Sequence, residues 1–273
     1  MVKSINIKKK IKKFNKKIFV SGDKSISIRW VLLSSLAHAT SRAKNLLMSE
    51  DVKAAIKTVK KLGIKVKINK NFCEIKGNGI NGYNYKKNIT LNAQNSGTLG
   101  RLILGLLINT PEPIKLIGDK SLSRRDFKRV TDPLTKFGAK FKLRKNRYLP
   151  LTIFGSNKLN SINYFENKGS AQCKSSVIFG GLRAKGETII KARKSRNHTE
   201  LMLNHLNLPI EVKSKKKYDF IKISQVKKIN KLNYNIPSDI SSGAFFIALT
   251  ALTPKSELII KNVNVNPSRI GIL

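Results

Sequence analysis

The feature that most constrains the fold of this chain is an internal repeat. Four times along the sequence, a short segment of small polar residues precedes a strongly apolar stretch long enough to form a helix. These openings contain Ser25, Ser96, Ser170 and Ser241, which lie 71, 74 and 71 residues apart. The period exceeds that of common solenoid repeats, so we expect each unit to be a small α/β subdomain.

Within each unit the pattern continues in a constant order. A β-rich run follows each apolar helix, at residues 43–47, 114–117, 188–191 and 258–261. In the first three units we expect a second helix next, with a serine as its N-cap residue (Ser49, Ser123 and Ser195). Gly63 and Gly138 mark the ends of the first two of these helices, and alternating strands follow. The pattern therefore predicts the element order helix, strand, helix, strand, strand in each unit. A fourth unit begins near Asp239.

Cations recur at one position of the first three apolar helices. Arg29, Arg101 and Lys174 each lie four residues after a small residue of the first turn. A cation at a helix N-terminus opposes the helix dipole, so its presence there is easier to explain if an anion binds to the free N–H groups of that turn. The three placements suggest a multiply charged anionic ligand. Two alternatives stay open: Arg101 and Lys174 pair with local carboxylates, and Ser25 and Ser170 are plain helix caps.

The charge of the chain is extreme, with 55 lysines and arginines against 15 acidic residues and a formal net charge of +40. The excess is mostly lysine spread along the whole chain, which indicates a solvated surface more than a nucleic-acid face. Its densest run, residues 8–17, is the best candidate for incidental polyanion binding or for an edge strand. No RNA-binding motif, zinc finger or recognition helix is found in the sequence.

The sequence lacks the features of membrane-spanning, secreted and metal-binding proteins. No apolar run reaches the length of a membrane span, and the N-terminus has no secretory signal. Cys73 and Cys173 have no metal-ligand spacing, so we expect two reduced thiols and a cytoplasmic protein.

Six ordered motifs resemble those of the EPSP synthase family, the 3-phosphoshikimate 1-carboxyvinyltransferases, in the form called class II. They lie at residues 22–29, 95–98, 118–125, 169–175, 195–200 and 237–246, so the resemblance covers the whole chain. It implies an α/β inside-out barrel with three complete βαβαββ-type repeats and the start of a fourth. Residues 22–238 would form the complete three-repeat domain, and residues 1–21 and 239–273 an incomplete second domain.

The resemblance implies an activity and a set of site residues. The family transfers the enolpyruvyl group of phosphoenolpyruvate to the 5-hydroxyl of shikimate 3-phosphate, through a tetrahedral adduct and without a metal or other cofactor. Lys24 would be the catalytic residue and would contact both substrates. The family's motifs place the following residues at shikimate 3-phosphate: Lys24, Ser25, Arg29, Ser170, Gln172, Ser195 and Arg196. They place these at phosphoenolpyruvate: Lys24, Gly97, Thr98, Arg125 and Gln172. Asp126 departs from the family, where a proline usually follows the arginine.

The family has six units, so this chain is expected to be a C-terminally truncated part without turnover of its own, and the full-length protein a monomer. Its partners would be the two small anionic substrates, with no specific nucleic acid and no membrane. Two alternatives remain. The sister family that acts on UDP-N-acetylglucosamine shares the fold, but Lys24-Ser25 and the absence of a cysteine in residues 111–125 argue against it. The other alternative is a non-catalytic polyanion-binding protein.

Overall fold

The computed structural model describes residues 10–70 and 72–273, in two compact units. The larger unit is Lys24–Ile236, and the smaller one combines Met1–Asp23 with Pro237–Leu273. Lys8 and Lys9 of the lysine-rich run lie outside the described residues. The rest of that run is mostly exposed, and its last residues enter a strand. No helix within residues 10–70 and 72–273 is long and apolar enough to cross a membrane.

The larger unit contains three four-stranded sheets that share one topology. The first has the order β13 (Tyr234–Asn235), β2 (Thr40–Lys44), β4 (Phe72–Lys76), β3 (Lys65–Ile68). The second has the order β5 (Thr90–Asn92), β6 (Ile114–Ile117), β8 (Tyr148–Phe154), β7 (Lys140–Arg144). The third has the order β9 (Asn163–Glu166), β10 (Glu187–Arg193), β12 (Tyr218–Ser224), β11 (Ile210–Ser214). In each sheet the first two strands are parallel and the other pairings are antiparallel.

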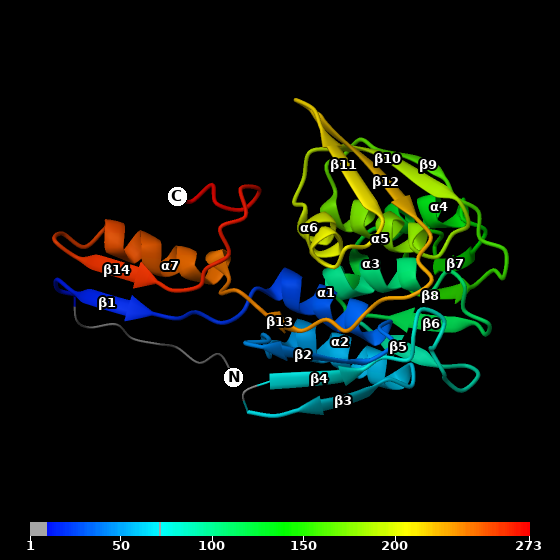
Figure 1. The fold of residues 1–273 in the computed structure, drawn as a ribbon, viewed down its shortest axis with the longest axis horizontal. Helices are drawn as coiled ribbons and strands as arrows, with labels where there is room; N and C mark the ends of the chain where they lie inside the picture. Colours follow the sequence, from blue (N-terminus) through cyan, green and yellow to red (C-terminus); the bar gives the residue numbers. More distant parts are fainter. Residues whose placement is uncertain (1–9, 71) are drawn as a thin grey trace. The chain divides into compact units, whose positions relative to one another are not determined.

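The predicted apolar helices are α1 (Lys24–Ser35), α3 (Gly97–Leu106) and α5 (Ala171–Gly181), and the three sheets surround them in Figure 1. In the second and third sheets, α3 and α5 are the crossovers that connect the two parallel strands. In the first sheet α1 leads into β2, and the parallel partner β13 comes from the end of the larger unit. The apolar residues of the 102–108 segment are fully buried, which confirms that a helix hydrophobic on all sides lies in the interior. The amphipathic second helices are α2 (Glu50–Lys61), α4 (Lys128–Thr135) and α6 (His198–His205). The predicted α/β fold of three βαβαββ repeats is therefore confirmed.

The starts of the second helices differ from the expectation. Ser49 does precede α2, but its side chain makes no capping hydrogen bond. Ser123 lies inside a 3-10 turn (Leu122–Arg124) and donates its hydroxyl to the Gly118 carbonyl, and α4 begins only at Lys128. Likewise α6 begins at His198, three residues after Ser195. In the second repeat Ser123 therefore does not cap the helix, because its hydroxyl is used as a donor within its own loop. The helix ends are as predicted, because Gly63 and Gly138 adopt φ of 85° and 117°.

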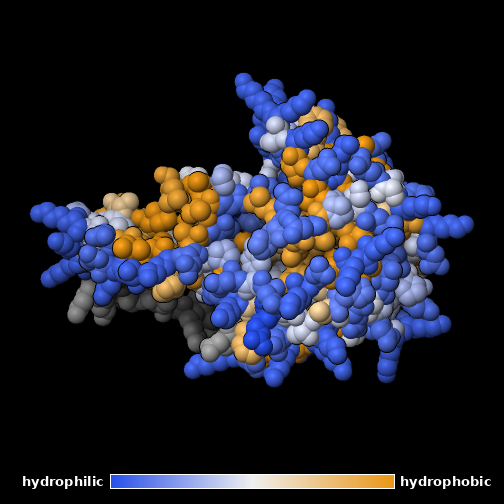
Figure 2. Space-filling model, in the orientation of Figure 1, coloured by the Kyte–Doolittle hydropathy of each residue, from blue (hydrophilic) through white to orange (hydrophobic). Residues whose placement is uncertain are grey.

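The smaller unit contains one βαβ arrangement. β1 (Asn15–Ile18) pairs in parallel with β14 (Glu257–Ile260), and α7 (Ile240–Ala251) precedes β14 in the chain. The Asp239 carboxylate accepts a hydrogen bond from the Ser241 amide at 2.9 Å and caps α7. Apolar side chains gather on the surface over α7 in Figure 2. Phe245 of this helix and Leu252, which directly follows it, are strongly exposed.

Candidate functional site

The candidate site lies where the first turns of α1, α3 and α5 meet in the larger unit. Gln172 of α5 links two of these turns, because its Nε2 donates to Thr98 Oγ1 at 3.1 Å and its Oε1 accepts from Arg101 Nη1 at 2.8 Å. Arg29 of α1 joins the third turn, with Nη2 donating to Ser175 Oγ of α5 at 3.1 Å. The N-terminal ends of three helices therefore lie side by side, which concentrates free N–H groups and positive dipole ends in one place.

The direction of the helices follows from a second contact further along them. Ser176 Oγ of α5 donates to the Arg101 carbonyl of α3 at 2.9 Å. Contacts therefore advance along both helices in the same direction, from Thr98 and Gln172 to Arg101 and Ser176, so α3 and α5 are parallel. Parallel packing is what keeps both N-termini at one end of the unit.

Serine caps shape two of these turns. Ser96 Oγ accepts from the Leu99 amide and Ser170 Oγ from the Cys173 amide, each at 3.3 Å. The cap reading of Ser170 is therefore observed. Ser25 lies half-buried in the first turn of α1, where its carbonyl accepts from Arg29 Nη1 at 3.0 Å.

Gly97 allows two arginines to approach the first turn of α3. A Cβ at this position would lie 2.8 Å from Arg101 Nη1 and 3.0 Å from Arg125 Nη1, so a larger residue would require these two guanidinium groups to shift. Arg125 is exposed and donates from Nη2 to Asn95 Oδ1 at 3.1 Å. Four of the residues predicted to face phosphoenolpyruvate, namely Gly97, Thr98, Arg125 and Gln172, are thus brought together.

Lys24 stands at the first turn of α1 with its side chain half exposed, and its Nζ lies 3.0 Å from the Asp51 carboxylate. Asp51 belongs to the first turn of α2, where a carboxylate complements the helix dipole. The sequence motifs gave no sign of this partner, since Asp51 falls outside all six. The only feature of the sequence that could have indicated this ion pair is the presence of an acidic residue in the first turn of α2.

The other cations of the repeat pattern have separate environments. Lys174 is fully buried and its Nζ lies 2.6 Å from Glu200, so the alternative of a carboxylate partner holds and Lys174 does not face a ligand. Arg101 pairs with the Gln172 amide instead of a carboxylate, and burial is the main cause that lowers its pKa. Arg29 is also buried, and its Nε donates to Thr199 Oγ1 at 2.7 Å. The three cations thus occupy equivalent helix positions, but each has a different kind of partner: a carboxylate for Lys174, a side-chain amide for Arg101 and hydroxyl groups for Arg29.

The segment of Ser195 and Arg196 borders the same end of the unit. A Cβ on Gly169, next to Ser170, would lie 3.5 Å from the Lys194 carbonyl, so the two loops are neighbours. Arg196 is exposed, whereas the Ser195 hydroxyl is buried and has no hydrogen-bond partner among the described residues. Thr199, whose importance the sequence did not reveal, holds Arg29 and also donates to Ser175 Oγ at 2.6 Å.

A pocket of about 350 Å³ lies beside the site, between the start of α2 and the loops after β5 and β6. It is lined by Glu50, Asp51, Asn92, Gln94, Asn95, Gly118 and Asp119. Its three carboxylates, from Glu50, Asp51 and Asp119, make this pocket unfavourable for an anion. Within the described ranges, no group of three or more His, Cys, Asp or Glu side chains could hold a metal ion.

Comparison with known proteins gives relatives over nearly the whole chain. The family model for EPSP synthase (3-phosphoshikimate 1-carboxyvinyltransferase) matches residues 8–273. A 3-phosphoshikimate 1-carboxyvinyltransferase of Caldicellulosiruptor bescii is 41% identical over 264 residues, which are 96% of this chain and 60% of the relative. One of Thermoanaerobacter sp. is 40% identical over 273 residues, covering 98% of this chain and 62% of the relative.

A solved structure agrees with these relatives. EPSP synthase from Acinetobacter baumannii superposes with a TM-score of 0.87 at 32% identity, over 96% of this chain and 58% of that one. The chain therefore spans about 60% of the length of the curated relatives it matches. The matched family is the one whose motifs the sequence resembles, and not the sister family that acts on UDP-N-acetylglucosamine. This chain belongs to the EPSP synthase family.

Proposed function

We propose that this chain takes part in the transfer of the enolpyruvyl group of phosphoenolpyruvate to the 5-hydroxyl of shikimate 3-phosphate, which yields EPSP and phosphate. The observation that carries the proposal is the meeting of three helix N-termini with Lys24, Gln172 and Arg125 in a chain that matches the family over residues 8–273. Both substrates are multiply charged anions, and such a cluster of N–H groups and cations is suited to them.

On the shikimate 3-phosphate side, we assign the phosphate to Ser170, with Gln172 reaching both ligands. Ser25 and Arg29 act from α1, and Ser195 and Arg196 close the pocket from their loop. Because the guanidinium of Arg29 already bonds Thr199, Ser175 and Ser25, most of its contribution lies in holding α1, α5 and α6 in place. Arg196 is exposed and remains available for the ligand.

On the phosphoenolpyruvate side, Gly97 lets the ligand approach the backbone of α3, with Thr98 beside it and Arg125 supplying a guanidinium fork. Lys24 lies between the two substrates and assists proton transfer. In the addition step the 5-hydroxyl loses its proton as its oxygen bonds C2 of phosphoenolpyruvate, and C3 gains a proton, so the adduct is formed with no net change in protons. In the elimination step the bond from C2 to the phosphate oxygen breaks, C3 loses one proton to restore the double bond, and the released phosphate takes up a proton.

Binding is the direct test, measured by calorimetry with shikimate 3-phosphate and phosphoenolpyruvate at moderate salt. Lys24→Gln is expected to weaken both ligands by roughly 2 kcal/mol, as for a charge-assisted contact. Lys12→Gln removes the same charge from an exposed site and should change either affinity by less than about 0.5 kcal/mol. Equal losses in both variants would mean that the overall charge attracts the ligands, as in a polyanion-binding protein.

We further propose that the smaller unit begins the second domain of the family and that the full-length protein works in the cytoplasm as a monomer. Support for the first part comes from β1, α7 and β14, which repeat the parallel arrangement of β5, α3 and β6. Size-exclusion chromatography with light scattering tests the oligomeric state.

A further inference from the structure

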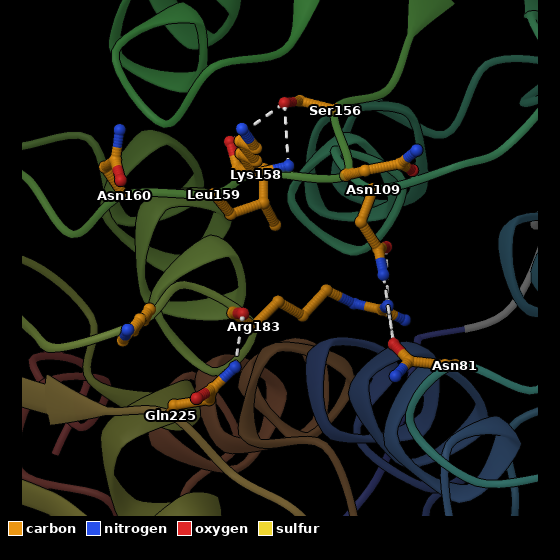
Figure 3. A pocket seen from close by; sticks show the side chains of 10 residues that line it. Asn81, Asn109, Ser156, Lys158, Leu159, Asn160, Arg183 and Gln225 are labelled. Atoms are coloured by element: carbon orange, nitrogen blue, oxygen red, sulfur yellow. Dashed lines mark hydrogen bonds between the residues drawn. The ribbon is translucent and has the colours of Figure 1, made fainter.

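A second polar pocket lies at the opposite end of the helices from the candidate site. It has a volume of about 640 Å³, and Figure 3 shows the side chains around it. Arg183 follows the last residue of α5 by two positions, and Asn109 follows that of α3 by three. Because α3 and α5 are parallel, this pocket is at their C-terminal ends, a helix length away from Gln172 and Thr98. No residue assigned to the candidate site lines it.

The unusual member of this pocket is Arg183, which is only 7% exposed. Its Nη1 donates to Asn109 Oδ1 at 2.6 Å and more weakly to Asn81 Oδ1 at 3.4 Å, as Figure 3 shows. Its Nε and Nη2 are buried and have no hydrogen-bond partner among the described residues. A buried cation with unmet donors carries a desolvation cost that is usually offset by an anion.

No anion of this protein fills that role. Within residues 10–70 and 72–273, no carboxylate lies within ion-pair distance of Arg183, and its Cζ lies 5.8 Å from the centre of the Tyr83 ring. Burial lowers the pKa of Arg183 to about 10, which still leaves it charged at neutral pH. The nearby C-terminal ends of helices favour a cation, but among the described residues none of their carbonyl groups accepts a hydrogen bond from Arg183 Nε or Nη2.

The rim of the pocket adds charge of the same sign and neutral hydrogen-bonding groups. Lys158 and Lys185 are exposed there, and none of the lining residues is acidic. The remaining polar lining is rich in side-chain amides, contributed by Asn81, Asn109, Asn157, Asn160 and Gln225. Amides both donate and accept, which suits hydroxyl groups, whereas three cations without a carboxylate suit a dianion.

We propose that this pocket binds a small hydroxylated phosphate ester, with its phosphate held between Arg183 on the floor and Lys158 and Lys185 on the rim. The site is separate from the proposed transferase site and does not rest on it. Its volume exceeds that of an inorganic ion and admits a ligand of a few carbon atoms, whose hydroxyl groups would bond the amides.

Side-chain amide signals in NMR spectra can test this, because they report the two ends of the helices separately. Inorganic phosphate and glycerol 3-phosphate are titrated into the full chain at constant ionic strength, with chloride as the reference anion. The signals of Asn81, Asn109 and Gln225 should shift and saturate with phosphate but not with chloride. Glycerol 3-phosphate should bind at least about three times more tightly, as expected for added hydroxyl contacts. Any shift of Gln172 belongs to the other site.

Variants give the second half of the test. Arg183→Gln should weaken the phosphate titration at least about tenfold, as for the loss of a charge-assisted contact. Arg193→Gln, which removes an exposed arginine of β10 outside the pocket, should leave it within about twofold. If Arg183→Gln does not fold, Lys158→Gln combined with Lys185→Gln keeps the buried arginine and should still weaken binding several-fold.

The inference is overturned if the three amides show no saturable shift, if chloride shifts them equally, or if Arg183→Gln, or the combined change of Lys158 and Lys185, binds phosphate as the unmodified chain does. Equal affinity for inorganic phosphate and glycerol 3-phosphate would overturn the assignment of a hydroxylated ester.

Discussion

At the scale of single residues, the pairing of Lys174 with Glu200 decides how α5 and α6 fit together. Both side chains are almost completely buried, and their charged atoms lie 2.6 Å apart. Removing water from two charges is costly, and their attraction repays that cost only while both partners remain. The packing of α6 against α5 therefore depends on the presence of both charges.

Glu200→Gln should lower the free energy of unfolding by about 3–5 kcal/mol, because it leaves the ammonium group of Lys174 buried without a counter-charge. Glu50→Gln is the matched control, since Glu50 forms an exposed ion pair with Lys53 at 3.0 Å. That change should cost less than about 1 kcal/mol. Urea denaturation followed by circular dichroism measures both. A loss for Glu200→Gln no larger than for Glu50→Gln would show that the buried pair does not stabilise the fold.

The sequence located these cations but could not identify their partners. The i+4 spacing places Lys174 on the helix face of Ser170, and nothing local says that Glu200, on another helix, closes over that face. Arg29 shows the same limit, because its partners Ser175 and Thr199 come from two other helices. Partner identity depends on the packing of distant segments, and local sequence patterns do not contain it.

At the scale of elements, the close contact of α3 with α5 depends on Gly105. A Cβ at this position would lie only 2.1 Å from the Ser176 carbonyl oxygen, so the two helix backbones approach to a distance that only glycine allows. Gly100, five residues earlier in α3, is less crowded: a Cβ there would lie 3.3 Å from Phe127 Cζ and 3.4 Å from Ala93 Cβ, which is tight but needs a shift of only a few tenths of an ångström by a neighbouring side chain.

These two glycines of one helix form a matched pair. Alanine favours a helix by about 1 kcal/mol over glycine, so Gly100→Ala should be near neutral. Gly105→Ala gains the same amount but forces α5 away, and overpacking of this kind costs typically 1–3 kcal/mol. We expect the thermal midpoint of Gly105→Ala to fall clearly below that of Gly100→Ala in a calorimetric scan. Equal midpoints would mean that the helices can separate without loss.

Much of the element order could be predicted from the sequence, for reasons specific to each element. The apolar helices and the glycine ends at Gly63 and Gly138 carry local signals, and the structure confirms them. The start of α4 was missed because Ser123 uses its hydroxyl within its own loop. β13 was missed because two residues, Tyr234 and Asn235, form a strand only by pairing with β2, far away in the sequence.

At the scale of the whole molecule, the hydrophobic core belongs to the larger unit. The contiguous cluster of buried apolar side chains runs from Ile26 to Ile236 and includes residues of all three repeats. In the smaller unit α7 buries only Ile240 and Gly243, and large side chains such as Phe245 remain exposed. Stability should therefore reside mainly in the larger unit.

A polypeptide of residues 24–236 is expected to fold without the smaller unit, because it contains the whole core cluster and all strands of the three sheets. Its urea transition should be a single cooperative step, with dispersed amide signals like those of the intact chain. A broad transition with binding of the dye ANS would instead indicate a molten globule and would contradict this expectation.

The path of the chain through the first sheet has a further consequence. β13, near the end of the larger unit, is the strand that lies before α1 in space, and the Asp23 amide bonds the Pro237 carbonyl at 2.8 Å where the two connections pass. If Ile236 were joined to Lys24 by a short linker, the first repeat would read through without interruption like the other two. The larger unit is thus a closed ring of three equivalent modules, and it is inserted between the two chain segments that form the smaller unit. Such a ring has no obligatory first module, so circular permutants opened between β4 and β5 or between β8 and β9 would retain every strand pairing.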